Sequence, residues 1–362
     1  MKDILLRATG LLPPAPGNYR QGIGRANYEL LKAIIDIKTD LKFSFYCNQF
    51  ERPFYSFKEW PIRHYWNIIP NRFNSYCAIE AVWRKCFTKY DLFHITDNYA
   101  QVLPNERFVV TIHDLKLYEE IPQSRPLFEK MTQNSLGIVT CSEYTKSEIL
   151  RFFAVESDKI TVIPWGINHE LFYPRSVEEI NKVRNKYHIK NKYFFACSCA
   201  HPRKNARDIL KAFRMFSKEV DETSLVLAWS NVPKDILEEY KNEINAGSVI
   251  FLDYVDDEEL AILYSGAMSS FLISSLEGFG FPILESMACG TNCITCRNSS
   301  MTEIGDKYAI FVEEHNIASI CEAMKKLIQL GKGDVEQLAD YASTYTWKKT
   351  ASLYIDFYKK FL

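Results

Sequence analysis

Residues 277–285 read Glu277-Gly-Phe-Gly-Phe-Pro-Ile-Leu-Glu285, and Ser-Met-Ala-Cys-Gly follows directly. Two carboxylates stand at the ends of this stretch, with a Gly-Phe-Gly turn and a proline suited to the first helical position between them. The apolar run 270–275 precedes it and predicts a short buried strand. The order strand, glycine turn, helix start presents backbone N–H groups and the positive end of a helix dipole. The stretch therefore predicts a site for an anion such as a phosphate, with carboxylates that can hold sugar hydroxyls.

This stretch resembles the E-x7-E signature of retaining family 4 glycosyltransferases, and residues 286–290 continue the resemblance. The resemblance implies that Glu277 holds hydroxyls of the donor sugar and that Glu285 holds the ribose of the nucleotide. A plain structural alternative makes Glu277 a surface residue and lets Glu285 only complement a helix dipole. The resemblance also implies that the donor contacts the turn residues Gly278, Phe279, Gly280 and Phe281.

Bulk properties exclude several classes of protein. The chain has 362 residues, which predicts two domains of about 150–200 residues each. A formal net charge of −1 gives no electrostatic reason to expect nucleic acid as a partner. No run approaches the ~18 apolar residues of a membrane span, and the apolar run at the N-terminus is too short for a signal peptide. The 10 cysteines lack paired metal-ligand spacing, which favours free buried thiols in a reducing cytoplasm.

Both halves of the chain alternate strand-like and helix-like segments. The proline-bracketed segment 164–174 separates the halves and is predicted to be a linker. Alternating strands and helices predict parallel, doubly wound α/β sheets, which bind ligands at the carboxyl ends of their strands. The resemblance implies the GT-B fold, in which two Rossmann-like domains face each other across a cleft. The expected parts are an acceptor-side domain 1–165, a nucleotide-sugar domain 166–345, and a helix 346–362 that crosses back to the first domain.

The run Ala200-His-Pro-Arg-Lys-Asn-Ala206 lies between a predicted strand and a predicted helix. Arg203 and Lys204 therefore fall in a strand-to-helix loop, where two cations can bind a diphosphate and take up its charge as it leaves. The run resembles the "PRKN" of family 4 enzymes, whose basic residues clamp the pyrophosphate. The family has a glycine a few residues earlier, whereas this chain has Ser198-Cys199, so one phosphate contact is expected to differ. A solvated basic loop is the alternative.

The run Gln21-Gly-Ile-Gly-Arg-Ala-Asn27 resembles the N-terminal glycine loop of the family. Gly22 and Gly24 at a helix start would tolerate a second anion. A dinucleotide fingerprint is rejected, because its third glycine would fall at Asn27 and the loop starts about 13 residues after the preceding strand. A purely structural turn remains the alternative.

His113 follows the predicted strand 108–112, in a run that looks like the "TIHDL" of mannosyl- and glucosyltransferase-like members. The resemblance implies that His113 contacts the primary hydroxyl of the donor sugar or steadies positive charge; capping the strand end is the alternative. Asp257 lies in the acidic run 253–259. The matching loop of the family lies beside the nucleobase, so Asp257 favours guanine and hence GDP, although helix-start carboxylates explain the run equally simply. We expect no metal there.

The segment 54–85 is dense in aromatic and basic side chains. In a family whose N-terminal domain holds the acceptor, it is a candidate contact for a lipid-linked glycan or a membrane surface. An irregular packed excursion is the alternative. The side chains in question are Trp60, Arg63, Tyr65, Trp66, Arg72, Phe73, Trp83, Arg84 and Lys85.

The resemblance, which covers most of the chain, implies a cytoplasmic retaining hexosyltransferase, peripheral to a membrane if the segment 54–85 meets one. It would move mannose or glucose from a GDP- or UDP-hexose to a glycan or lipid-linked acceptor, without cofactor or metal. Catalytic roles fall to residues that position the donor and stabilise charge. A nucleotide-sugar epimerase on the same fold, which needs no acceptor, and a non-catalytic nucleotide-sugar-binding partner remain as alternatives. The catalytic candidates are His113, Arg203, Lys204 and Glu277.

Overall fold

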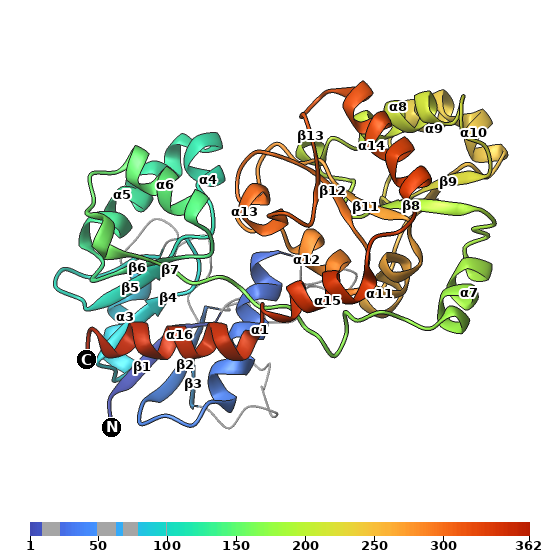
Figure 1. The fold of residues 1–362 in the computed structure, drawn as a ribbon. Helices are drawn as coiled ribbons and strands as arrows, with labels where there is room; N and C mark the ends of the chain where they lie inside the picture. Colours follow the sequence, from blue (N-terminus) through green and yellow to red (C-terminus); the bar gives the residue numbers. More distant parts are fainter. Residues whose placement is uncertain (9–21, 49–62, 68–78, 99) are drawn as a thin grey trace. The chain divides into compact units, whose positions relative to one another are not determined.

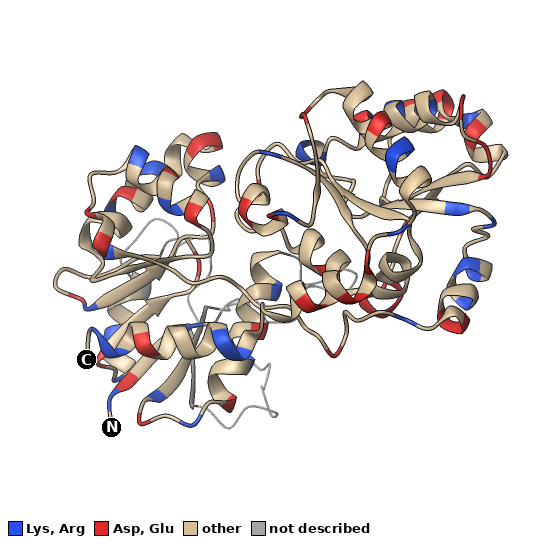
Figure 2. Cartoon of the chain, in the orientation of Figure 1, with Lys and Arg blue, Asp and Glu red and all other residues tan. Residues whose placement is uncertain are grey.

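The computed structural model describes residues 1–8, 22–48, 63–67, 79–98 and 100–362 (Figure 1). Its contacts divide the chain into two compact units. Unit 1 consists of Met1–Gly166 and Trp347–Leu362, and unit 2 consists of Ile167–Thr346. Lys and Arg are interspersed with Asp and Glu over both units (Figure 2), and no described helix has the length and apolar character to cross a membrane.

Unit 1 is built on a seven-stranded sheet in which every neighbouring pair is parallel. The strand order is β3-β2-β1-β4-β5-β6-β7. Its strands are β1 (Asp3–Arg7), β2 (Lys42–Asn48), β3 (Arg63–Asn67), β4 (Leu92–Ile95), β5 (Phe108–Thr111), β6 (Ile138–Thr140) and β7 (Ile160–Val162). Its helices are α1 (Ile23–Asp36), α3 (Ile79–Phe87), α4 (Lys116–Glu120), α5 (Arg125–Asn134), α6 (Glu143–Phe152) and α16 (Trp347–Lys359).

Unit 2 repeats the plan with a six-stranded parallel sheet in the order β10-β9-β8-β11-β12-β13. Its strands are β8 (Lys192–Ala196), β9 (Thr223–Ala228), β10 (Val249–Leu252), β11 (Ser269–Leu272), β12 (Cys293–Cys296) and β13 (Ile310–Val312). Its helices are α7 (Val177–Lys186), α8 (Ala206–Phe216), α9 (Lys234–Glu239), α10 (Lys241–Asn245), α11 (Asp257–Gly266), α12 (Phe281–Ala288), α13 (Met301–Gly305), α14 (Ile317–Leu330) and α15 (Val335–Ser343).

The strand orders confirm the prediction of doubly wound α/β sheets. In each sheet the chain winds outward in one direction, returns to the middle and winds in the other direction. The strand order therefore reverses between β1 and β4 in unit 1 and between β8 and β11 in unit 2. Ligands of open α/β sheets bind at such a switch point, outside the carboxyl ends of the strands. The two switch points thus mark where a site is to be sought.

The C-terminal helix α16 belongs to unit 1, although unit 2 precedes it in the chain, as the expected fold class requires. It packs beside α1 (Figure 1), and a buried polar chain attaches it to the sheet. Tyr358 Oη hydrogen-bonds His94 Nδ1 at 2.7 Å, and His94 Nε2 hydrogen-bonds Thr111 Oγ1 at 2.8 Å. Tyr354 Oη lies 3.2 Å from the same threonine oxygen. Because these polar atoms are buried, their hydrogen bonds fix how the helix docks.

The segment 54–85 is only partly described, and one of its residues departs from the expectation of a surface contact. Arg84 is fully buried and pairs with Glu106 at 2.8 Å, while its guanidinium lies 4.0 Å from the centroid of the Phe93 ring. Arg84 is therefore a core residue, which corrects its place among the surface candidates. Residues 54–62 and 68–78 lie outside the described residues, and so do the side chains of β3.

Candidate active site

The switch point of unit 2 brings together the two loops that carry the charged residues predicted from the sequence. Strands β8 and β11 pair directly, with Phe194 opposite Ser269 and Ala196 opposite Phe271. The chain leaves β8 into a loop that ends in the 3-10 turn Pro202–Lys204, and it leaves β11 into the loop that holds Glu277. Because the strands are parallel and adjacent, both loops leave the same edge of the sheet.

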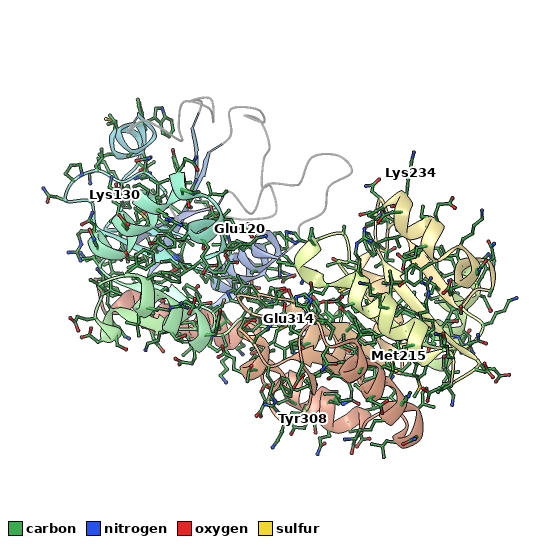
Figure 3. The ribbon with its side chains drawn as sticks, turned by 90° about the horizontal axis from the view of Figure 1, so that it is seen from above. Glu120, Lys130, Met215, Lys234, Tyr308 and Glu314 are labelled. Atoms are coloured by element: carbon green, nitrogen blue, oxygen red, sulfur yellow. The ribbon has the colours of Figure 1, made fainter. Side chains whose placement is uncertain are left out.

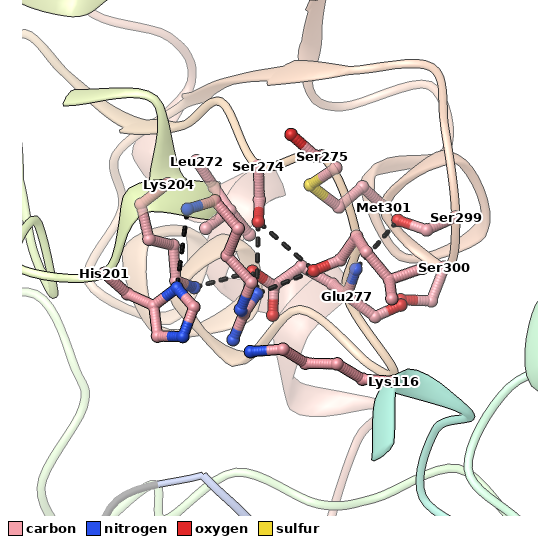
Figure 4. A network of polar contacts seen from close by, with 12 residues as sticks. Lys116, His201, Lys204, Leu272, Ser274, Ser275, Glu277, Ser299, Ser300 and Met301 are labelled. Atoms are coloured by element: carbon pink, nitrogen blue, oxygen red, sulfur yellow. Dashed lines mark hydrogen bonds and ion pairs between the residues drawn. The ribbon is translucent and has the colours of Figure 1, made fainter. Parts of the chain in front are cut away.

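Glu277 is paired with both predicted cations; Figure 4 labels Glu277 and Lys204 in this network. Lys204 Nζ donates to Glu277 Oε1 at 2.6 Å, and Arg203 Nη1 donates to the same oxygen. Arg203 Nη1 also donates to the Leu276 carbonyl at 2.6 Å and to Ser274 Oγ at 3.1 Å. The side chains of Lys204 and Glu277 are each 10% exposed, against 28% for Arg203. The sequence predicted these three residues separately, and the structure joins them in one network.

The charge of Glu277 is held by this network. Burial alone would raise the pKa of the Glu277 carboxyl, but Lys204 and Arg203 outweigh burial and hold that pKa below its ordinary value. Glu277 is therefore ionised at neutral pH and shares its charge with two cations. Such an arrangement can exchange one ion pair for a phosphate and leave the carboxylate free to accept a hydroxyl hydrogen bond.

A third loop, after β12, fixes the backbone of Glu277. The Glu277 N–H donates to Ser299 Oγ at 3.1 Å, and Ser300 Oγ donates to the Glu277 carbonyl at 2.8 Å. The Ser275 N–H donates to the Arg203 carbonyl at 2.9 Å. Sequence reasoning missed Ser299 and Ser300. The only sequence signal for them was their place just after a predicted strand of the same sheet.

The glycine turn leads into α12 as predicted, with two adjustments. Gly280 stands before the helix with φ 103°, a left-handed conformation that suits glycine. The helix begins at Phe281, so Pro282 occupies its second position instead of the first. The ring of Phe279 is 2% exposed and packs against Phe281 and Tyr345, at 5.3 and 6.3 Å between ring centroids. Phe279 is thus a packing residue, whereas Gly278 and Phe281 are half-buried.

Glu285 lies in the second turn of α12 and is only 5% exposed. This position is past the unpaired N–H groups of the helix start, so complementing the dipole is not its main role. Tyr264 Oη, from α11, donates to Glu285 Oε2 at 3.5 Å, and Cys197 Sγ lies 3.0 Å from the same hydroxyl. Burial, with Cys197 and Glu285 nearby, raises the pKa of Tyr264, so its hydroxyl stays a donor.

Asp257 is not brought into this network. It is exposed and opens α11, after the edge strand β10, while its neighbour Asp256 caps the helix by accepting from the Glu259 N–H at 2.7 Å. Over the described ranges, no group of three or more His, Cys, Asp or Glu side chains is arranged to hold a metal ion.

In unit 1, His113 follows β5 and is 2% exposed. Its ring Nε2 lies 2.7 Å from the Thr96 carbonyl, and its backbone N–H donates to Asn98 Oδ1 at 2.7 Å, while its ring packs on Trp165. A carbonyl only accepts, so Nε2 carries the proton and Nδ1 is left as an acceptor. Within the part of the chain that the structure describes, Nδ1 has no hydrogen-bond partner. Burial lowers the pKa of His113, which favours this neutral ring.

The glycine pair of unit 1 opens α1. Gly22 precedes the helix with φ 51°, and Gly24 lies in its first turn. A Cβ on either glycine would meet no heavy atom of the described residues within 4 Å. Gln21, the first residue of the predicted loop, lies outside the described residues.

The chain is similar to known proteins along most of its length. The family model described as "Glycosyl transferases group 1" matches residues 177–345, and the one described as "Glycosyltransferase Family 4" matches residues 21–171. O-antigen chain mannosyltransferase B of Escherichia coli is 29% identical over 236 residues, which is 62% of each chain. Serotype-specific mannosyltransferase WbdA of Escherichia coli is 25% identical over 74% of this chain and 36% of its own length. The alignments thus span less than two thirds of these curated relatives.

Solved structures share the fold over the whole chain. The sucrose-phosphate synthase of Thermosynechococcus elongatus superposes with a TM-score of 0.77 at 16% identity, covering 99% of both chains. Anabaena HepE in complex with UDP gives a TM-score of 0.75 at 15% identity, covering 99% of this chain and 100% of its own. The two family models lie side by side along the sequence and the fold extends over both. The chain is therefore a member of glycosyltransferase family 4 with the GT-B fold.

Proposed function

We propose that the chain is a retaining hexosyltransferase that moves mannose or glucose from a GDP- or UDP-linked donor to a glycan or lipid-linked acceptor. The names of three relatives support mannose: O-antigen chain mannosyltransferase B, WbdA and O-antigen chain mannosyltransferase RfbU. Neighbouring structures that contain UDP or UDP-glucose keep a UDP donor in contention. The eight cysteines whose side chains the structure describes are all free, which supports a reducing compartment such as the cytoplasm.

One observation carries the proposal: Arg203 and Lys204 converge on Glu277 at the switch point of unit 2, just ahead of the start of α12. Two cations and a helix start suit a diphosphate, and an adjacent ionised carboxylate suits sugar hydroxyls. This combination is what a nucleotide-diphosphate sugar presents. Glu285, buried one helical turn further on, is proposed to accept from the ribose hydroxyls, with Tyr264 holding its carboxylate.

The proposed reaction forms a bond between the acceptor oxygen and the anomeric carbon while the bond from that carbon to the phosphate oxygen breaks. The acceptor proton passes to the departing phosphate on the same face of the sugar, so no protein nucleophile and no metal takes part. Arg203 and Lys204 stabilise the charge that develops on the diphosphate. Glu277 orients the sugar, and Nδ1 of His113 is proposed to accept a hydrogen bond from a sugar hydroxyl.

The first test follows donor consumption with GDP-mannose and UDP-glucose, each with and without a mannose oligosaccharide acceptor and with EDTA throughout. The proposal is supported if one nucleotide is released only when acceptor is present. NMR of the product must also show that the new glycosidic bond has the same anomeric configuration as the donor. Conversion of the donor sugar without acceptor would favour an epimerase. Binding of nucleotide without turnover of either donor would favour a non-catalytic role.

Two variants test the assigned roles. Glu285→Ala is expected to weaken nucleoside diphosphate binding by about 10- to 150-fold, because the loss of a charged hydrogen bond costs about 1.5–3 kcal/mol. Glu277→Gln is expected to lower kcat and to leave the affinity for free nucleoside diphosphate equal or higher, since it frees two cations from a competing carboxylate. Calorimetric titration and initial rates separate the two, and wild-type values in both variants would refute the site.

A further inference from the structure

A fourth loop at the same edge of the unit 2 sheet contributes Glu314, two residues after β13. Its side chain is 26% exposed, lies 3.2 Å from His315 Nε2, and accepts two hydrogen bonds from other loops. Asn298 Nδ2 donates to Glu314 Oε2 at 2.7 Å, and Asn205 Nδ2 donates to Glu314 Oε1 at 3.2 Å. The position of Glu314 in the fold can be followed by its label in Figure 3. One carboxylate therefore joins the loops that follow β8 and β12.

Both asparagines lead directly to the site. Asn205 is the next residue after Lys204, and its amide also donates to Ser275 Oγ at 3.2 Å. The amide of Asn298 also donates to the Ser274 carbonyl at 3.2 Å. The loop of Glu277 is thus connected to Glu314 on two sides, through two different amides.

The backbone around Glu314 is held in conformations that need support. Asn205, Ser299 and His315 have φ of 50°, 49° and 58°, in the left-handed region that L-residues rarely adopt. Each such residue costs about 1–3 kcal/mol and persists only when its surroundings hold it. Non-glycine residues in this conformation cluster at functional sites. Here Asn205 and His315 contact the Glu314 carboxylate, and Ser299 directly follows Asn298, its third partner.

We propose that Glu314 is a positioning residue, which sets the spacing between Glu277 and its two cations by holding the loops of Asn205 and Asn298 together. The inference rests on the proposed transferase function and assigns Glu314 no contact with the donor. Both asparagines present N–H donors, so their common partner must accept twice. A carboxylate does this with its two oxygens, whereas the amide of a glutamine offers one acceptor and two donors.

The main test compares the full chain with its Glu314→Gln variant. The cations remain, so the Kd for GDP or UDP is expected to stay within about threefold. Turnover depends on alignment to a fraction of an ångström, so kcat is expected to fall about tenfold or more. A matched control is Asp235→Asn, which loses a surface contact to Arg207 at 2.7 Å in the same unit and is expected to leave kcat unchanged.

A rescue variant separates positioning from mere stability. In Asn205→Asp with Glu314→Gln, the glutamine amide donates to the new aspartate, its oxygen accepts from Asn298, and Ser275 Oγ can donate to the aspartate. The two hydrogen bonds that join the loops through residue 314 are then restored, with the polarity of the one to residue 205 reversed. Asn205→Asp alone places two carboxylates together and is expected to impair kcat, while the double variant recovers most of it.

The outcomes are distinct. A fall in kcat for both single variants with recovery in the double variant, at unchanged midpoints of thermal unfolding, supports the inference. An unchanged kcat in Glu314→Gln overturns it, and so does a fall that follows the unfolding midpoint and is not rescued. If the wild-type chain transfers no sugar from either donor, the proposed function itself has failed. That outcome is distinct from failure of the inference, which appears only when the variants are compared with an active wild type.

Discussion

Gly290 ends the motif that follows the Glu277–Glu285 stretch, and its replacement by alanine tests how α12 is held. The residue has φ 72°, in the left-handed region. A Cβ there would lie 2.4 Å from Val335 Cγ1 and 3.2 Å from Val335 Cβ. Atoms cannot approach so closely, so α15, which begins at Val335, would have to move away from α12.

Two effects determine the expected loss of stability in Gly290→Ala. A left-handed conformation costs an alanine about 1–2 kcal/mol relative to its usual conformations. Overpacking of a well-packed contact costs about 1–3 kcal/mol more. We therefore expect the free energy of unfolding to fall by about 2–5 kcal/mol, measured as a shift in the urea midpoint of unit 2.

Gly247→Ala provides the matched control. Gly247 also has φ 72°, but a Cβ there would meet no heavy atom of the described residues within 4 Å. Gly247→Ala is therefore expected to lower the free energy of unfolding only by the cost of the left-handed backbone conformation. The effect of alanine on the unfolded chain is common to both variants. Adding Val335→Ala to Gly290→Ala removes the closest contact and is expected to restore part of the difference. Equal losses in Gly290→Ala and Gly247→Ala would refute the steric argument.

Three further predictions concern the rest of the fold. Arg84→Met leaves Glu106 buried without its cation and is expected to lower the free energy of unfolding by about 3–5 kcal/mol; a loss below about 1 kcal/mol in urea unfolding would contradict this. Ser198→Gly, at φ 57° where the family has a glycine close by, is expected to raise that free energy by about 0.5–1 kcal/mol, and a decrease would show that the serine side chain is needed. Burial lowers the pKa of His94 to about 3 from an ordinary 6.5, so protons bind the unfolded chain first and stability is lost as pH falls below about 6.5. Protonation of His94 in the unfolded chain is expected to lower the free energy of unfolding by about 2 kcal/mol between pH 7 and pH 5. In His94→Gln, that free energy should therefore fall by about 2 kcal/mol less over the same range than in the wild type. An equal fall in both proteins would contradict the prediction.

Local patterns in the sequence predicted most elements and the character of the site. Serine is a preferred residue just before a helix, and Ser142 accepts from the Thr145 N–H at 3.1 Å at the start of α6. The 277–285 stretch predicted strand, glycine turn and helix in the observed order. By contrast, β3 and α3 were not predicted, because the aromatic and basic residues of that segment show no clear period of two or 3.6.

Contacts between distant residues came only from the tertiary structure. Glu277 meets Lys204 across 73 positions, because β8 and β11 are neighbours in the sheet although two strands and four α-helices separate them in the chain. Tyr358 meets His94 across 264 positions, which places α16 in unit 1. The physical reason is that periodicity and turn chemistry depend on neighbours in sequence, whereas strand order depends on how whole faces pack. The residue types of the site could be predicted from the sequence, whereas the order of the strands brings two cations and one carboxylate together.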